Sequence, residues 1–122
     1  MSGARLPPGF TEQRPWGHYV VLADEADHKV KRIVVDPGSR LSLQYHHQRA
    51  EHWSIVSGEG VVTRGDDRIP VRAGTDVAIP AGARHRVENT GKEPLVFIEV
   101  QRGSYFGEDD IVRLHDDFGR VG

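Results

Sequence analysis

The sequence predicts an all-β chain that folds as a sandwich or barrel. Valine and isoleucine together number 21, against 6 leucines, and β-branched side chains suit a pleated, half-buried surface better than a helix. Short apolar runs recur along the chain with turn residues between them, which is the spacing typical of sandwiches and barrels. No apolar stripe with a period of 3.6 residues is long enough to compete.

The apolar runs define nine strands. We expect them over residues 19–22, 29–35, 40–46, 52–56, 60–63, 68–71, 76–79, 85–88 and 95–101. Most breaks between them contain glycine, proline, aspartate or asparagine, which supply a positive φ or a fixed turn dihedral. These breaks are Asp36-Pro37-Gly38, Ser57-Gly58-Glu59-Gly60, Gly65-Asp66-Asp67, Ala73-Gly74, Pro80-Ala81-Gly82 and Asn89-Thr90-Gly91.

The length of 122 residues is that of one globular domain. We assign residues 14–122 to this domain, and within it residues 103–122 to a polar C-terminal extension. Residues 1–13, which contain the run Pro7-Pro8-Gly9, are expected to form an N-terminal tail. A second catalytic domain will not fit in this length.

Composition and charge exclude several classes of function. The chain has 16 basic and 18 acidic residues and no run rich in lysine or arginine, so we expect no nucleic-acid partner. It has no cysteine, which excludes disulfides, thiolate metal ligands and cysteine nucleophiles. The N-terminus lacks the apolar core of a signal peptide, and nothing approaches about 18 consecutive apolar residues, so we expect a cytoplasmic protein without membrane contact.

Side chains that can bind a metal are spaced so that they can meet on adjacent strands. Because side chains alternate along a strand, Gln44 and His46 share one face of the 40–46 strand. Glu51 follows five residues after His46, and His85 follows the Pro80-Ala81-Gly82 turn. A lone histidine in a β-barrel is more often a structural residue, so the case for a metal depends on all four residues together.

These residues resemble the two signatures of the cupin superfamily. The first spacing consists of Gly38, Gln44, His46, Glu51 and Gly58, with Gln44 where the signature usually has histidine. The second consists of Gly74, Pro80, Gly82, His85 and Asn89, without departure. The resemblance implies a cupin double-stranded β-helix, a small jelly-roll barrel. It also implies one divalent metal ion with the ligands Gln44, His46, Glu51 and His85.

Two imidazole nitrogens and two oxygens form a ligand set that is borderline between hard and soft. We expect zinc first, and the set also suits manganese, cobalt, iron or nickel. The other histidines are left out of the set. His47 and His52 lie out of phase with the ligands, and His18, His28 and His115 are expected at the surface.

Longer phrases resemble one cupin family, the type II phosphomannose isomerases, which include the C-terminal part of bifunctional mannose-1-phosphate guanylyltransferases. The phrases are Arg14-Pro15-Trp16-Gly17, Lys29-Val30-Lys31-Arg32-Ile33, Leu41-Ser42-Leu43-Gln44, Arg49-Ala50-Glu51-His52-Trp53, Ile98-Glu99-Val100-Gln101 and Gly107-Glu108-Asp109-Asp110-Ile111-Val112-Arg113. Gln44 is the residue that this family is expected to have at its position. Gln48 departs from the family, which commonly has a third histidine there. We expect no upstream nucleotidyltransferase domain, so GDP-mannose synthesis is not implied.

The resemblance implies interconversion of mannose 6-phosphate and fructose 6-phosphate through an enediol. That reaction needs a metal, a base and cations for the phosphate. For the base we name Glu99, which shares a strand face with Gln101; the alternative is that Glu99 pairs with a buried lysine or arginine. Lys31, which shares a face with Lys29, is a second interior candidate, unless its strand is a solvated edge.

For the phosphate we name Arg102 and Arg113, because a guanidinium can hold phosphate oxygens through two parallel donors. Each could instead form a surface ion pair. The main alternative function is a non-catalytic cupin that binds metal and sugar phosphate, and a third is an iron-dependent cupin oxygenase. We expect a sugar phosphate as the small-molecule partner. Because small cupins present apolar sheet faces, we also expect a homodimer.

Overall fold

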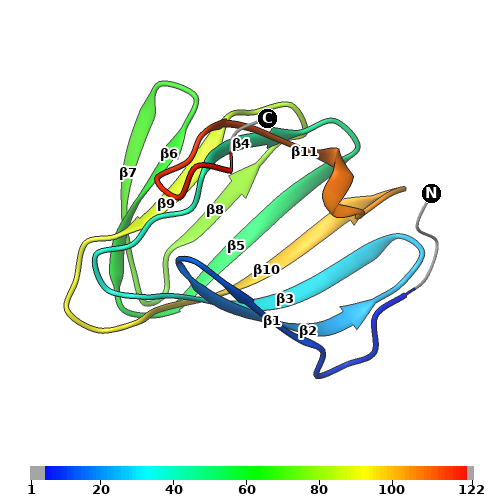
Figure 1. Cartoon of the computed structure of the whole chain (residues 1–122), viewed down its shortest axis with the longest axis horizontal. Coiled ribbons are helices and arrows are strands. Elements are labelled where there is room, and N and C mark those ends of the chain that lie inside the picture. The colour runs from blue at the N-terminus through cyan, green and yellow to red at the C-terminus, as the bar shows by residue number, and fades with distance from the viewer. Residues whose placement is uncertain (1–4, 121–122) are drawn as a thin grey trace.

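The computed structural model describes residues 5–120, which form two antiparallel β-sheets that face each other (Figure 1). The strands are β1 (Thr11–Arg14), β2 (Gly17–Asp24), β3 (His28–Val35), β4 (Leu43–His46), β5 (Arg49–Ser57), β6 (Glu59–Arg64), β7 (Asp67–Arg72), β8 (Asp76–Ile79), β9 (His85–Asn89), β10 (Leu95–Gly103) and β11 (Ile111–His115). One sheet has the order β1-β2-β3-β10-β5-β8, and the other has the order β11-β4-β9-β6-β7.

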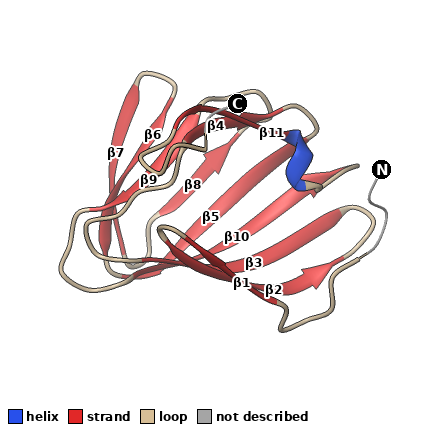
Figure 2. Cartoon of the chain, in the orientation of Figure 1, coloured by secondary structure: helices blue, strands red, loops and turns tan. Residues whose placement is uncertain are grey.

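This architecture confirms the all-β prediction. Within residues 5–120 the one helix is the short 3₁₀ helix η1 (Glu108–Asp110), drawn in blue in Figure 2. The described residues therefore include no helix with the length and apolarity needed to cross a lipid bilayer.

All nine predicted strands are present, as β2 to β10. The prediction for residues 40–46 began too early, because β4 starts at Leu43. Before that point Arg40 forms an isolated bridge with Glu88, and Leu41 donates its amide to the Val87 carbonyl. Residues 40 and 41 thus form isolated contacts with β9, and regular strand pairing begins only with β4.

Two further strands lie in the segments expected to be a tail and a polar extension. Residues 11–13 of the expected tail belong to β1, which pairs with β2 from Thr11 opposite Val20 to Arg14 opposite Gly17. In the extension, β11 pairs with β4. Both strands lie at sheet edges. The polar sequence of β1 is common at an edge, and its pairing with β2 makes it a strand. In β11 the apolar residues Ile111, Val112 and Leu114 were a strand signal that the prediction of a polar extension missed.

Three neighbouring strands, β3, β10 and β5, share one inward pattern: apolar side chains at one end and polar or charged side chains at the other. The polar inward residues are Lys29, Lys31, Arg49, Glu51, Glu99 and Gln101, and all are buried. Strand register aligns them, with Lys31 opposite Glu99 and Gln101 opposite Glu51. One end of the barrel is therefore a packed apolar core, and the other end is a polar pocket.

Candidate metal centre

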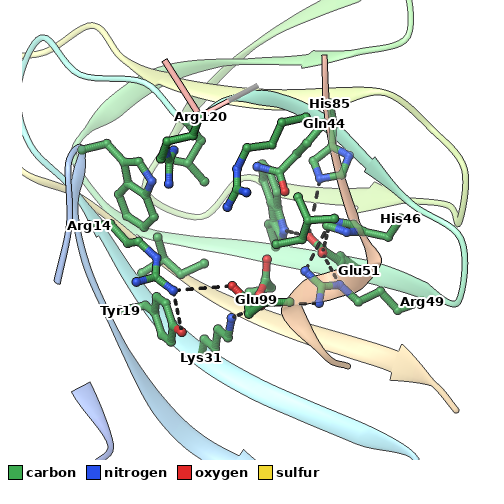
Figure 3. A pocket seen from close by; sticks show the side chains of 17 residues that line it. Arg14, Tyr19, Lys31, Gln44, His46, Arg49, Glu51, His85, Glu99 and Arg120 are labelled. Carbon is green, nitrogen blue, oxygen red and sulfur yellow. Dashed lines mark hydrogen bonds and ion pairs between the residues drawn. The ribbon is translucent and has the colours of Figure 1, made fainter. Parts of the chain in front are cut away.

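Four side chains from three strands meet at the polar end of the barrel. His46 ends β4, Glu51 lies in β5 and His85 begins β9, and each is at most 3% exposed. One possible ligand atom from each of these three residues lies within 4.8 Å of the other two. Gln44 is paired with His85 across β4 and β9, and Figure 3 shows it next to that histidine. The structure thus brings the four expected ligands together.

The ring nitrogens of both histidines face the Glu51 carboxylate. His85 Nδ1 lies 2.9 Å from the Ala83 carbonyl oxygen, so Nδ1 carries the proton and donates it. The unprotonated Nε2 then faces Glu51 Oε1 at 3.8 Å. His46 Nε2 lies 3.0 Å from the other carboxylate oxygen, Oε2. Two imidazoles and a carboxylate at these distances form a ligand set that fits a divalent cation.

Gln44 adds an amide oxygen to these donors. Its Nε2 donates to the Ser42 hydroxyl at 2.9 Å and lies 3.4 Å from the Ser42 carbonyl oxygen. Ser42 is fully buried, which fixes this contact. Because the amide nitrogen already donates a hydrogen bond and carries no free lone pair, Gln44 Oε1 is the atom that can bind a metal. The resulting set of two nitrogens and two oxygens suits several first-row divalent ions.

Two buried donors hold Glu51. Trp53 Nε1 donates to Glu51 Oε1 at 2.9 Å, and Arg49 Nε donates to Oε2 at 3.0 Å. Burial alone would raise the pKa of Glu51, but the hydrogen bond from His46 and the charge of Arg49 hold that pKa well below its ordinary value. Burial lowers the pKa of His85. The carboxylate is therefore ionised and His85 is neutral, which are the forms that bind metals.

Glu99 and Lys31 lie in the same pocket. Glu99 is 5% exposed, and its Oε1 accepts a hydrogen bond from Gln101 Nε2 at 2.5 Å. Burial and the neighbouring Glu51 carboxylate raise the pKa of Glu99 to about 8. Lys31 is buried on β3, a strand with a neighbour on each side, so the solvated-edge alternative does not hold. Its ammonium nitrogen lies 4.0 Å from the centre of the Tyr19 ring.

The two arginines named for the phosphate lie in different places. Arg113, on β11, lines the pocket. Arg102 does not, because it follows the inward-facing Gln101 on β10 and alternation turns it to the exposed outer face of the sheet. We therefore withdraw Arg102 as a phosphate ligand. The sequence alone could have excluded Arg102, because Glu99 and Gln101 share the inward face of β10 and the next residue, Arg102, must then face outward.

Four charged residues that line the pocket escaped the sequence analysis. They are Arg14, Arg49, Glu108 and Arg120. Arg49 could have been found, because it is in phase with Glu51 on β5. The other three come from β1, η1 and the chain after β11, whose positions depend on contacts between distant segments.

Comparison with known proteins points to one family. The family described as Mannose-6-phosphate isomerase C-terminal matches residues 9–116. The xanthan biosynthesis protein XanB of Xanthomonas campestris pv. campestris strain B100 is 54% identical over 108 residues. The mannose-1-phosphate guanylyltransferase of Escherichia coli K12 is 49% identical over 108 residues. Each alignment covers 88% of this chain and 23% of the relative, so the chain spans less than a quarter of these relatives.

Solved structures show the same fold. The capsular polysaccharide assembling protein CapF from Staphylococcus aureus matches with a TM-score of 0.74 at 24% identity, over 87% of this chain and 34% of CapF. A Klebsiella pneumoniae protein with a double-stranded β-helix domain matches with a TM-score of 0.67 at 25% identity, over 72% of this chain and 77% of that protein. The chain therefore belongs to the mannose-6-phosphate isomerase C-terminal family and folds as a cupin double-stranded β-helix.

Proposed function

We propose that this chain is a metal-dependent aldose–ketose isomerase that interconverts mannose 6-phosphate and fructose 6-phosphate through an enediol. The observation that carries the proposal is the convergence of His46, Glu51 and His85, with Gln44, in a pocket that also contains the buried carboxyl group of Glu99. The reaction needs both features, a cation at the carbonyl oxygen and a group that moves a proton between neighbouring carbons. Membership of the family supports the same reaction.

The four ligands would hold one divalent ion, for which we propose zinc first. With one carboxylate and three neutral donors, such an ion would keep a charge of about +1 and would supply Lewis-acid chemistry toward a substrate oxygen. Arg49 adds a fixed positive charge beside this position, since its NH2 lies 3.3 Å from His46 Nε2 and its Nε lies 3.0 Å from Glu51 Oε2. A buried cation stabilises negative charge that develops on a substrate oxygen.

Glu99 is the residue we assign to proton transfer between the carbons. It takes the proton from C2 of the open-chain aldose while the C1 oxygen gains a proton, which gives the enediol. It then returns a proton to C1 while the C2 hydroxyl loses its proton, which gives the ketose. Lys31 lies opposite Glu99 in the β3–β10 pairing, and we assign it the proton that moves between the two oxygens. Gln101 holds Glu99 in place through the hydrogen bond to Oε1.

The test is conversion of mannose 6-phosphate to fructose 6-phosphate by protein stripped of metal and reloaded in turn with zinc, manganese, cobalt, iron or nickel. We expect turnover with at least one metal and no turnover from His85→Ala. His47→Ala is the matched control, because His47 is exposed and does not line the pocket.

Two results would favour the other functions. Folded, metal-loaded protein that binds mannose 6-phosphate without converting it would indicate the non-catalytic binding module. Strict dependence on iron together with oxygen uptake would indicate an oxygenase. Full isomerase activity with zinc would exclude the oxygenase, because zinc has no redox chemistry.

A further inference from the structure

The outer face of the six-stranded sheet carries a broad set of aliphatic side chains. On β3, β10 and β5 the residues between the buried ones face outward, because side chains alternate along a strand. Figure 1 shows these three strands side by side, with β2 next to β3. The outward aliphatic residues of this sheet include Val20, Val30, Val34, Val56, Val96, Ile98 and Val100, all at least partly exposed.

Strand β10 reverses the usual alternation of a half-solvated sheet, in which apolar side chains face inward and polar ones outward. Its inward residues Glu99 and Gln101 are polar because they belong to the pocket, whereas the outward residues Ile98 and Val100 are aliphatic. The pocket explains the inward residues only. A contiguous aliphatic face on the other side of the sheet is typical of a surface that binds another protein.

This face is large enough for a stable interface. Strands β2, β3, β10 and β5 have 8, 8, 9 and 9 residues. At about 3.3 Å per residue and about 4.8 Å between strands they span roughly 500 Å² of flat area, and the accessible surface of side chains that project from it is larger. A standard interface takes about 800 Å² of accessible surface from each partner.

Two opposite charges flank the middle of the face. Strand register places Arg32 on β3, Ile98 on β10, Ser54 on β5 and Asp76 on β8 in one row across the sheet. Arg32 and Asp76 are exposed. They lie three strands apart, or about 14 Å, so they do not pair with each other within one chain.

A second copy of the chain brings these charges together. A two-fold axis that runs along the strands, between β10 and β5, places each row over the same row of the partner and reverses the strand order. Arg32 then faces the partner's Asp76, and Asp76 faces the partner's Arg32. Because a two-fold interface is isologous, the ion pair forms twice. Facing sheets pack at about 30° to each other, an offset that the long arginine side chain can span.

We propose that this outer face, centred on Ile98 and Ser54, binds a second copy of this chain across a two-fold axis, with reciprocal ion pairs between Arg32 and the partner's Asp76. The proposal gives the expected homodimer a surface and a register. It does not depend on the reaction assigned to the pocket, because the pocket is on the opposite side of the sheet and stays outside the interface.

The experiment measures the mass in solution by sedimentation equilibrium over a dilution series. We expect wild type to have twice the mass of one chain. Arg32→Glu and Asp76→Arg each place like charges opposite one another at two points, so each should raise the dissociation constant of the dimer by at least about 100-fold. The double variant Arg32→Glu/Asp76→Arg restores the pair with its charges exchanged and should return to within about tenfold of wild type.

Arg68→Glu is the matched control, because it makes the same change of charge at an exposed position on β7 of the other sheet. It should leave the dimer unchanged. If one of the single variants does not fold, the other tests the same contact from a different strand.

Three results would overturn the proposal. Wild type with the mass of a single chain would show that the face does not bind a second copy. A dimer that tolerates both single variants would lie on another surface. A double variant that dissociates as readily as the single variants would show that Arg32 and Asp76 do not face each other.

Discussion

Trp53 allows a specific test of the metal centre. Its Nε1 donates to Glu51 Oε1 at 2.9 Å, and both side chains are at most 2% exposed. Trp53→Phe keeps an aromatic ring near His85 and Phe97, whose ring centroids lie 5.6 and 4.9 Å from that of Trp53, but it removes the donor. Loss of such a partner of a metal ligand costs about 10- to 100-fold in metal affinity, or about 1.4–2.8 kcal/mol.

The assay is competition for zinc between the protein and a chelator of known affinity. Trp16→Phe is the control, because Trp16 is buried and lines the same pocket but is not among the donors to Glu51 within residues 5–120. We expect Trp53→Phe to bind zinc at least about tenfold more weakly than Trp16→Phe. Equal affinities of the two folded variants would refute the assignment of Glu51 as a ligand that Trp53 holds in place.

Residues around the pocket and at the turns give further predictions. Asp110 accepts two backbone N–H hydrogen bonds, at 3.2 and 2.9 Å, from the turn after β4, so Asp110→Ala should lower the free energy of unfolding in urea by about 2 kcal/mol or more. Hydrogen bonds from Arg120 lower the pKa of Asp116, so the stability that Asp116 contributes is complete above its unfolded pKa and is lost as the pH falls. The difference in unfolding free energy between wild type and Asp116→Asn should therefore shrink below about pH 4. Gly58 has a φ of 89°, and a Cβ there would lie 2.6 Å from the Pro94 carbonyl oxygen, so Gly58→Ala should cost roughly 2 kcal/mol and lower the melting temperature. The homodimer stays a prediction, for which light scattering should give twice the mass of one chain.

Each of these predictions can fail. Wild-type stability of Asp110→Ala would mean that the turn after β4 does not depend on η1. A difference for Asp116→Asn that stays constant with pH would contradict the ion pair with Arg120. An unchanged melting temperature for Gly58→Ala would show that the turn can adopt another conformation, and a single-chain mass would exclude the dimer.

The strand positions and the expected ligands could be predicted because both depend on local spacing. Alternation along β10 puts Glu99 and Gln101 on one face, and the structure buries both. The turn before β9 places His85 at the start of a strand next to β4, opposite Gln44. Residues a few positions apart were enough for these inferences.

The arginines that reach the pocket from the two ends of the chain could not be predicted in the same way. Arg14 and Arg120 lie near opposite ends of the chain, and they reach one pocket because β1 pairs with β2 and β11 pairs with β4. The sequence of β1 is polar and resembles a tail more than a strand, and β11 is a short apolar run inside an otherwise polar segment. Arg102 was a wrong prediction of another kind. Its guanidinium suits phosphate, but alternation along β10 places it on the outer face of the sheet.

A metal titration of turnover tests the proposed metal centre most directly. Metal-free protein receives stepwise additions of the ion that supports the highest activity, and conversion of mannose 6-phosphate is measured beside the metal bound per chain. We predict that turnover rises with bound metal up to one ion per chain and that Glu51→Gln loses both together. Turnover by metal-free protein, or wild-type turnover by Glu51→Gln, would contradict a catalytic metal held by these residues.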